Sequence, residues 1–372
     1  MFSRLRVLSL LTMLTLAVPL WAQRLCSSIP VGVGSDEDRL MTAVNGTENA
    51  QQQIEALDKF AQTHADSTYL PCVIEDIATI SFKAGDFDKS IEYGEKDLAA
   101  NYADLTLYLT LMRAYASSNK VSDTIFDVIN KVPAQIKAET PAPEIAKDGH
   151  DYAIWDFFQL LPRVTDPAKQ IPLIEAFVKA YPEQDNSAQV DSAYFQTYQR
   201  QRKPDKAVEY GDKAIAADPN NVGVLNSMGM LYAFYLPNPS PAKAAGYAQK
   251  ALAAAQASKK PDGVEDAAFK KQQDNQTGIA HLILGYASLM TAQKTTKFAP
   301  IFSELQNAST LLEGNPALQG QALYYLAFAY EKQSPPNHKA ALETLNKAVT
   351  LPGPFQGQAQ ALLEKVKVAA AK

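Results

Sequence analysis

A nine-residue segment that recurs along the chain constrains the fold more than any other feature. SIEYGEKDL at 90–98 and AVEYGDKAI at 207–215 align without a gap, and related segments run over 244–251 and 341–348. Apart from Asp97 in the first segment, they keep small or apolar residues at positions i, i+4 and i+7, which form one stripe of a helix. Small residues there let a second helix pack closely. A chain built from such helix pairs can reach 372 residues without a single large core, because each pair contacts only its neighbours.

The partner helix lies upstream of each repeated segment. Leu225, Met228, Gly229 and Tyr232 share one helical face, and the segment from about 188 to 221 ends in Ala-Asp-Pro-Asn-Asn. This pattern resembles the tetratricopeptide repeat, a 34-residue unit of two helices, A and B. The resemblance implies an all-α, right-handed α-solenoid of tetratricopeptide-like helix hairpins. A helical bundle without repeats is the alternative.

When the rest of the chain is aligned to this 34-residue unit, the pattern predicts repeats at about 71–104, 105–138, 188–221, 222–258, 278–315 and 320–353. The expected organisation is a signal peptide (1–22), an N-terminal tail (23–46), N-terminal repeats (47–138), a degenerate helical pair (139–187), central repeats (188–258), a helical extension or linker (259–277), C-terminal repeats (278–353) and a capping helix (354–372). A break is expected over 133–149, because its three prolines are incompatible with a continuous helix.

The first residues have the layout of a secretory signal peptide. Arg4 and Arg6 precede the apolar run 7–20, and a cleavage point follows Ala22. We therefore expect an exported protein, periplasmic or envelope-associated in a bacterium with two membranes; an uncleaved membrane anchor is the alternative. Cleavage removes two arginines and leaves 33 basic against 40 acidic residues, a net charge of −7. That balance argues against nucleic acid as a partner.

The two cysteines are Cys26 and Cys72. An oxidising compartment makes a disulfide between them possible. The alternative is that Cys72 is a small buried apolar residue and Cys26 a free thiol, because sequence does not determine whether two Cα atoms lie close enough to bridge.

The sequence carries no recognisable catalytic or metal-binding motif. The four histidines lie far apart, and no Cys accompanies them at ligand spacing. There is no nucleophile elbow, no phosphate-binding loop and no His-Glu-x-x-His. We expect no cofactor, no metal and no enzymatic activity. The alternative is an active site whose carboxylates come from distant repeats.

The resemblance also implies where a partner binds, because helix A of each repeat lines the concave side of the solenoid. The family's groove positions fall here on Arg113, Gln196, Arg200, Asn226, Met230, Phe234, Tyr286, Tyr324 and Phe328. We expect a protein or peptide partner in a groove that becomes apolar toward the C-terminus. The Lys and Asn set with which some of these domains grip a peptide carboxylate is missing.

Two other interpretations of these residues stay open. Tyr286 and Tyr324 could stack on sugar rings, which favours a binding module for envelope polysaccharide or peptidoglycan fragments. Alternatively, the apolar members of the set pack against the next repeat and form part of the core.

Overall fold

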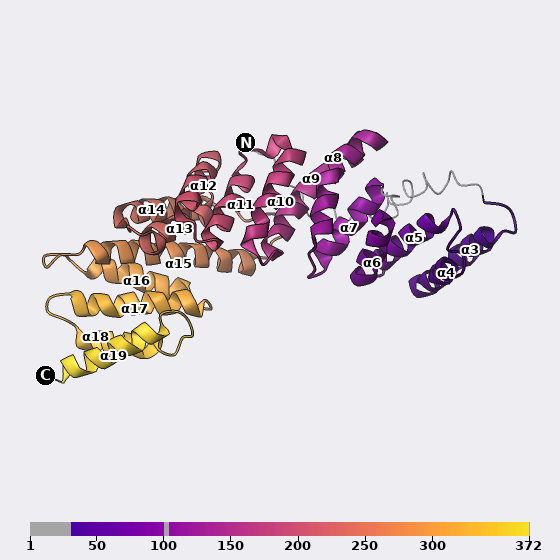
Figure 1. Ribbon diagram of the computed structural model, residues 1–372. Coiled ribbons are helices and arrows are strands. Elements are labelled where there is room, and N and C mark those ends of the chain that lie inside the picture. Colours follow the sequence, from indigo (N-terminus) through magenta and orange to yellow (C-terminus); the bar gives the residue numbers. More distant parts are fainter. Residues whose placement is uncertain (1–30, 100–103, 372) are drawn as a thin grey trace. The chain divides into compact units, whose positions relative to one another are not determined.

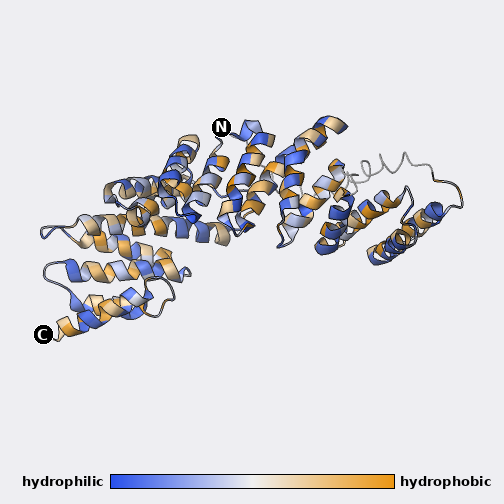
Figure 2. Cartoon of the chain, viewed as in Figure 1, coloured by the Kyte–Doolittle hydropathy of each residue, from blue (hydrophilic) through white to orange (hydrophobic). Residues whose placement is uncertain are grey.

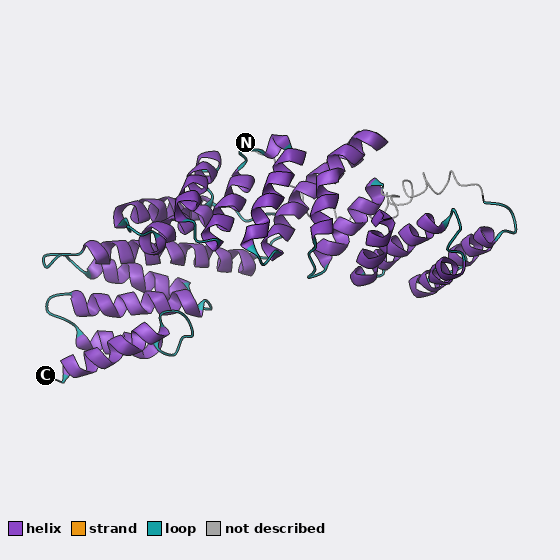
Figure 3. Cartoon of the chain, viewed as in Figure 1, coloured by secondary structure: helices purple, strands orange, loops and turns teal. Residues whose placement is uncertain are grey.

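A computed structural model describes residues 31–99 and 104–371 of the chain (Figure 1). Over these ranges the chain forms seventeen α-helices, α3 to α19, with short 3-10 and π segments and no strand (Figure 3). The predicted fold class, an all-α array of tetratricopeptide-like helix hairpins, is confirmed. The chain divides into two compact units, an N-terminal unit (Met1–Asp185) and a C-terminal unit (Asn186–Lys372).

The N-terminal unit contains the helices α3 to α10. Their bounds are α3 (Asp36–Asn45), α4 (Ala50–Thr63), α5 (Leu70–Lys83), α6 (Phe87–Ala99), α7 (Leu105–Ser117), α8 (Asp123–Glu139), α9 (Pro143–Leu160), η2 (Leu161–Arg163), α10 (Pro167–Ala180) and η3 (Pro182–Gln184). Each of α3 to α8 packs against the next helix in the chain. In addition, α7 contacts both α5 and α9. The alternate helices α5, α7 and α9 therefore form one layer, as the A helices of stacked hairpins do.

The C-terminal unit repeats this arrangement. Its elements are α11 (Ala188–Arg200), α12 (Pro204–Ala217), α13 (Val222–Met230), η4 (Leu231–Tyr235), α14 (Pro241–Ala257), α15 (Asp266–Thr291), α16 (Ala299–Leu311), α17 (Pro316–Lys332), α18 (His338–Ala348) and α19 (Gln356–Ala370). Helices α13, α15, α17 and α19 contact one another in sequence and form the A layer. Most helices carry both polar and apolar residues (Figure 2). Where the apolar residues recur at the helical period, they form one face that can be buried.

Local sequence explains where these helices begin. The Asn221 side chain accepts a hydrogen bond from the Val224 amide (3.1 Å) and caps α13. Pro204 and Pro241 stand in the first turns of α12 and α14, where the amide that proline lacks would have no helical partner. The predicted helical extension is the first half of α15, and the predicted capping helix corresponds to α19.

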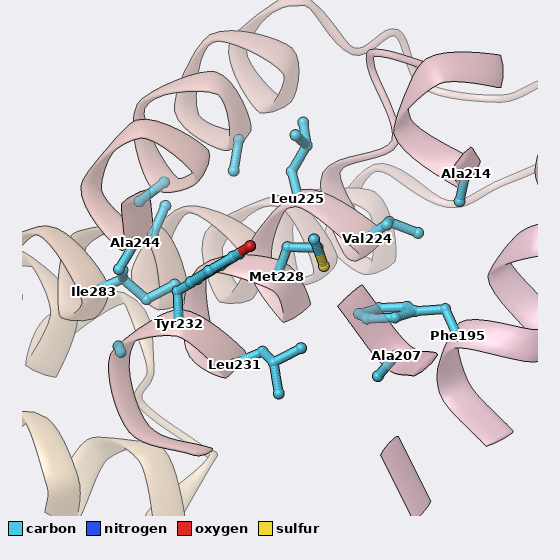
Figure 4. Close-up of a cluster of buried hydrophobic side chains, with 14 of the residues drawn as sticks. Phe195, Ala207, Ala214, Val224, Leu225, Met228, Leu231, Tyr232, Ala244 and Ile283 are labelled. Atoms are coloured by element: carbon cyan, nitrogen blue, oxygen red, sulfur yellow. The ribbon is translucent and has the colours of Figure 1, made fainter. Parts of the chain in front are cut away.

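The small residues of the repeated segment allow the close packing that the sequence predicts. Ala207 and Ala214 of α12 are fully buried, and Gly211 lies between them. A Cβ atom at Gly211 would overlap the Met228 side chain, which enters from α13 (Figure 4). Gly94 of α6 receives Leu111 of α7 in the same way, with 2.6 Å between the ideal Cβ position and Leu111 Cδ2.

Part of the predicted N-terminal tail is a helix instead. Residues Asp36–Asn45 form α3, which Ser35 caps by accepting a hydrogen bond from the Asp38 amide (3.2 Å). Leu40 and Val44 are buried in a cluster with residues of α4 and α5. The acidic residues 36–38 of the expected tail belong to the first turn of α3, where they face the positive end of the helix dipole.

The break predicted over 133–149 is wrong in extent, because α8 continues through Pro133 to Glu139 and α9 begins at Pro143. A proline inside a helix leaves the carbonyl four residues earlier without its backbone donor. Here that carbonyl is Ile129, and it accepts a hydrogen bond from the Tyr181 hydroxyl (2.7 Å). A side chain far along the chain thus replaces the missing hydrogen bond.

The predicted signal peptide and Cys26 lie outside the described residues, so the Cys26–Cys72 disulfide stays a prediction. Cys72 is buried on α5 at 3% exposure. Over residues 31–99 and 104–371, no helix has the length and apolar character that crossing a membrane requires.

Candidate functional site

Six aromatic side chains form a continuous row in the C-terminal unit. In spatial order they are Tyr235, Phe234, Tyr286, Tyr325, Tyr324 and Phe355. Neighbouring ring centroids lie 6.3, 4.3, 4.9, 5.2 and 5.4 Å apart along this order. These separations are those of interacting aromatic pairs. We call this set the aromatic row.

The row runs across consecutive A helices. Phe234 and Tyr235 end the π segment η4, Tyr286 lies on α15, and Tyr324 and Tyr325 lie on α17. Phe355 precedes the first residue of α19. Four successive elements of the A layer therefore each contribute to one surface, and the stacking of hairpins brings their rings together.

Local backbone features position the rings of the row at the end of η4 and on α15. The widened turn closes with the Leu236 amide donating to the Leu231 carbonyl (3.1 Å), and the Ser240 amide donates to the Tyr232 carbonyl (2.9 Å). Short π segments occur often at functional sites. On α15, Gly285 admits Leu305 of α16, with 2.6 Å from its ideal Cβ position to Leu305 Cδ2. The residue next to this close contact is Tyr286.

The row is neutral and partly open to solvent. Burial raises the pKa of Tyr286 and of Tyr325, so both phenols stay protonated at physiological pH. Tyr235 is 66% exposed, and Met290, one helical turn beyond Tyr286, is 37% exposed. Aromatic and Met side chains at a surface contribute large contact energies for the area they bury.

The structure brings together three of the predicted groove residues and separates the others. Phe234, Tyr286 and Tyr324 are members of the aromatic row. Met230 and Phe328 are half-buried and pack against the apolar clusters on either side of it. Phe234, Tyr286 and Tyr324 of the row also pack against buried apolar clusters, so all five apolar groove residues contact the core, as the alternative interpretation expects.

The prediction that Asn226 faces the groove is corrected. Asn226 is 3% exposed, and its side-chain amide donates to the backbone carbonyl (2.9 Å) and the Oε1 atom (2.7 Å) of Gln276. The helical extension at the start of α15 covers it, so Asn226 joins two A helices instead of meeting a ligand.

The remaining predicted residues lie elsewhere. Gln196 and Arg200 are exposed on α11, and none of the ring contacts of the aromatic row involves that helix. Arg113 lies on α7 in the N-terminal unit, half-buried above the ring of Tyr152.

Sequence reasoning missed Tyr325, Phe355 and Tyr235. Tyr325 directly follows a predicted groove residue, and consecutive helical residues point about 100° apart, so the helical pattern did not place both tyrosines in one surface. Phe355 was assigned only to the start of the capping helix. A signal existed for Tyr235, because an apolar-aromatic run ends there before the proline-rich loop 236–241.

The four histidines pair with carboxylates, and the described residues contain no cluster suited to a metal ion. No three His, Cys, Asp or Glu side chains among them are arranged to hold a metal ion. Each of the four histidines lies within 3.0 Å of one carboxylate: His64 with Asp36, His150 with Glu183, His281 with Glu304 and His338 with Glu331. His281 and Glu304 join α15 to α16 with a separation of 2.6 Å, which is a structural role.

Comparison with known proteins gives structural similarity alone. No protein-family model matches the sequence, and no curated protein matches it. Similar solved structures include the APC/C hetero-tetramer Cut9–Hcn1 (TM-score 0.36, 14% identity, 92% of this chain covered), yeast Tom70 (0.30, 11%, 91%) and Naa15/Naa10 bound to HypK-THB (0.35, 16%, 88%). The chain spans 65%, 97% and 49% of these chains, respectively. At these identities and TM-scores the three structures assign neither a partner nor an activity to it.

Proposed function

We propose that this protein is a non-catalytic helical-repeat scaffold, exported to the cell envelope, that binds a protein or peptide partner through the aromatic row. The observation that carries the proposal is the contact of six aromatic rings from four successive elements, ending in an exposed Tyr235. Tyr235 at the end of the row is 66% exposed, so a partner can reach the row there.

The chemistry of the row suits an apolar segment of a partner. Tyrosine and phenylalanine are rigid side chains with a large contact area, and their ordering on binding costs little conformational entropy. Met290 beside the row adds a flexible side chain that adapts to the shape of its ligand. Extended peptides and amphipathic helices both dock on surfaces of this kind.

Export and the envelope location rest on the N-terminal sequence. A tagged protein recovered from its own cells should begin at Gln23, and the intact mass measures this directly. A recovered protein that still begins at Met1 contradicts cleavage.

Partner binding is tested by affinity capture from envelope extract with paired variants. Tyr235→Ser and Met290→Ser each remove an exposed apolar group at the row. The matched control is Val368→Ser, which removes an apolar side chain of 61% exposure on α19, away from the row. Circular dichroism establishes that all three variants remain folded.

The proposal expects one stoichiometric protein that the wild type and Val368→Ser retain and that the two row variants lose. Equal retention by all variants contradicts a role for the row. If the wild type retains cell-wall glycans and no protein, and Tyr235→Ser loses these glycans, the row binds a polysaccharide and the proposed protein partner is wrong. If the protein also cleaves such a glycan, it is an enzyme and the proposed non-catalytic function is wrong.

A further inference from the structure

A second cluster of polar side chains lies in the A layer of the N-terminal unit, between α7 and α9. The Arg113 guanidinium carbon lies 5.8 Å from the centre of the Tyr152 ring. The Tyr152 ring centroid lies 5.4 Å from that of Trp155, one helical turn further along α9. All three side chains are half-buried, so solvent reaches part of each.

These three side chains carry hydrogen-bond donors that lack acceptors. Within the described residues, no oxygen accepts a hydrogen bond from the Arg113 guanidinium, the Tyr152 hydroxyl or the Trp155 indole N–H. Arg163 of the same unit is a useful contrast, because its guanidinium donates to the carbonyls of Tyr115 (3.0 Å), Ala116 (3.1 Å) and Ser118 (2.7 Å). The Arg113 guanidinium is partly exposed, so a ligand can reach it, and burial of the rest of the side chain lowers its pKa.

A buried carboxyl, that of Asp156, lies one helical turn beyond Tyr152 on α9. Asp156 is fully buried on α9, and neither of its oxygens has a hydrogen-bond partner. Burial raises its pKa to about 8, so Asp156 is mostly protonated and uncharged at neutral pH. Asp156 is therefore no anionic partner for Arg113 at neutral pH, and the positive charge of Arg113 stays available beside the rings of Tyr152 and Trp155.

We propose that Arg113, Tyr152 and Trp155 form a binding site for an oxyanion, the carboxylate or phosphate group of a ligand. A planar guanidinium matches the two oxygens of either group, and charge-assisted hydrogen bonds of this type are strong. A cationic or purely apolar ligand would leave the donors unsatisfied. The site belongs to the N-terminal unit and shares no residue with the aromatic row, so an experiment can contradict one of the two proposals without contradicting the other.

The protein offers an internal probe of this site. Trp21 and Trp155 are its two tryptophans. In the full chain carrying Trp21→Phe, tryptophan fluorescence reports on Trp155 alone. The experiment titrates this protein with acetate, with inorganic phosphate and with chloride at matched ionic strength, and records the emission of Trp155 together with the midpoint of thermal unfolding.

The expected result is a saturable change in Trp155 emission with acetate or phosphate and none with chloride, at concentrations up to on the order of 10 mM. Arg113→Met should weaken the response at least about tenfold, and Arg113→Lys should weaken it less, because a lysine keeps the charge but not the planar fork. Arg39→Met, which removes a surface arginine of the same unit, should leave it unchanged.

The two anion arms distinguish a carboxylate ligand from a phosphate ligand. If Arg113→Met does not fold, Tyr152→Phe tests the same site by removing one hydroxyl, and a several-fold loss of affinity is expected. Equal responses to all three salts, no saturation, or unchanged affinity in Arg113→Met or Tyr152→Phe would overturn the proposal.

Discussion

Tyr181 provides the hydrogen bond that Pro133 withholds from α8. Its ring is fully buried and stacks on Phe177 at 4.7 Å, while its hydroxyl donates to the Ile129 carbonyl. We expect Tyr181→Phe to lower the free energy of unfolding by about 1–3 kcal/mol, because a buried carbonyl loses its partner. Urea denaturation monitored by circular dichroism measures the change.

The double variant identifies the cause of that loss. In a Pro133→Ala background the alanine amide can donate to Ile129, so Tyr181→Phe should cost much less there. Equal costs in both backgrounds would show that the hydroxyl acts in some other way.

Replacing Gly211 or Gly246 of the C-terminal unit by alanine should change the free energy of unfolding in opposite directions. Gly211 faces Met228 and Phe195 with no room for a methyl group, whereas nothing lies within 4 Å of an ideal Cβ atom at Gly246. Gly211→Ala should therefore destabilise the unit by about 1–3 kcal/mol through overpacking. Gly246→Ala should stabilise α14 by up to about 1 kcal/mol through helix propensity. Thermal denaturation of the two variants checks both signs, and a shared sign contradicts the packing argument.

At the scale of elements, α19 covers the apolar face of the last hairpin. Ala359, Leu363 and Val366 are buried in a cluster with residues of α17 and α18. Leu363→Ala should cost about 2–5 kcal/mol, the usual range for a buried leucine. Val368→Ala on the exposed side of the same helix should change stability by less than about 0.5 kcal/mol. If chemical denaturation finds similar small values for both, α19 does not act as a cap.

The helical pattern of the sequence predicts some features of these elements and not others. Residue spacing predicted helix hairpins, because helical periodicity acts within a few neighbours along the chain. Pro133 in α8 could not be predicted, since its compensation comes from Tyr181, 48 residues later. For the same reason Asn226 was misplaced: its burial depends on Gln276 of another helix.

At the scale of the whole molecule, the N-terminal unit should become less stable as the pH rises. Burial raises the pKa of Glu75 to about 9, of Asp97 to about 7 and of Asp156 to about 8. In the unfolded chain these carboxyls have a pKa near 4. Between about pH 4 and pH 9 the folded state therefore holds more protons, and the free energy of unfolding falls as the pH increases.

The emission of Trp155 in the Trp21→Phe chain reports on unfolding of this unit, so its thermal midpoint should decrease from pH 5 to pH 9. Asp156→Asn removes one of the titrating groups and should flatten the curve between pH 5 and pH 8. A midpoint that rises with pH in the wild type, or an unchanged slope in Asp156→Asn, would contradict the assignment.

The sequence by itself determined the all-α class, the phase of the hairpins and the membership of Phe234, Tyr286 and Tyr324 in one surface. The helical class and the spacing of the hairpins follow from periodicity, which acts locally along each helix. The shared surface of Phe234, Tyr286 and Tyr324 is what the resemblance to tetratricopeptide repeats implied. Only the tertiary structure decided that Tyr325 and Phe355 complete the aromatic row, that Asn226 is covered, and that the donors of Arg113, Tyr152 and Trp155 meet no acceptor among the described residues. Each of these depends on contacts between side chains of different helices, and such contacts are set by how the helices pack.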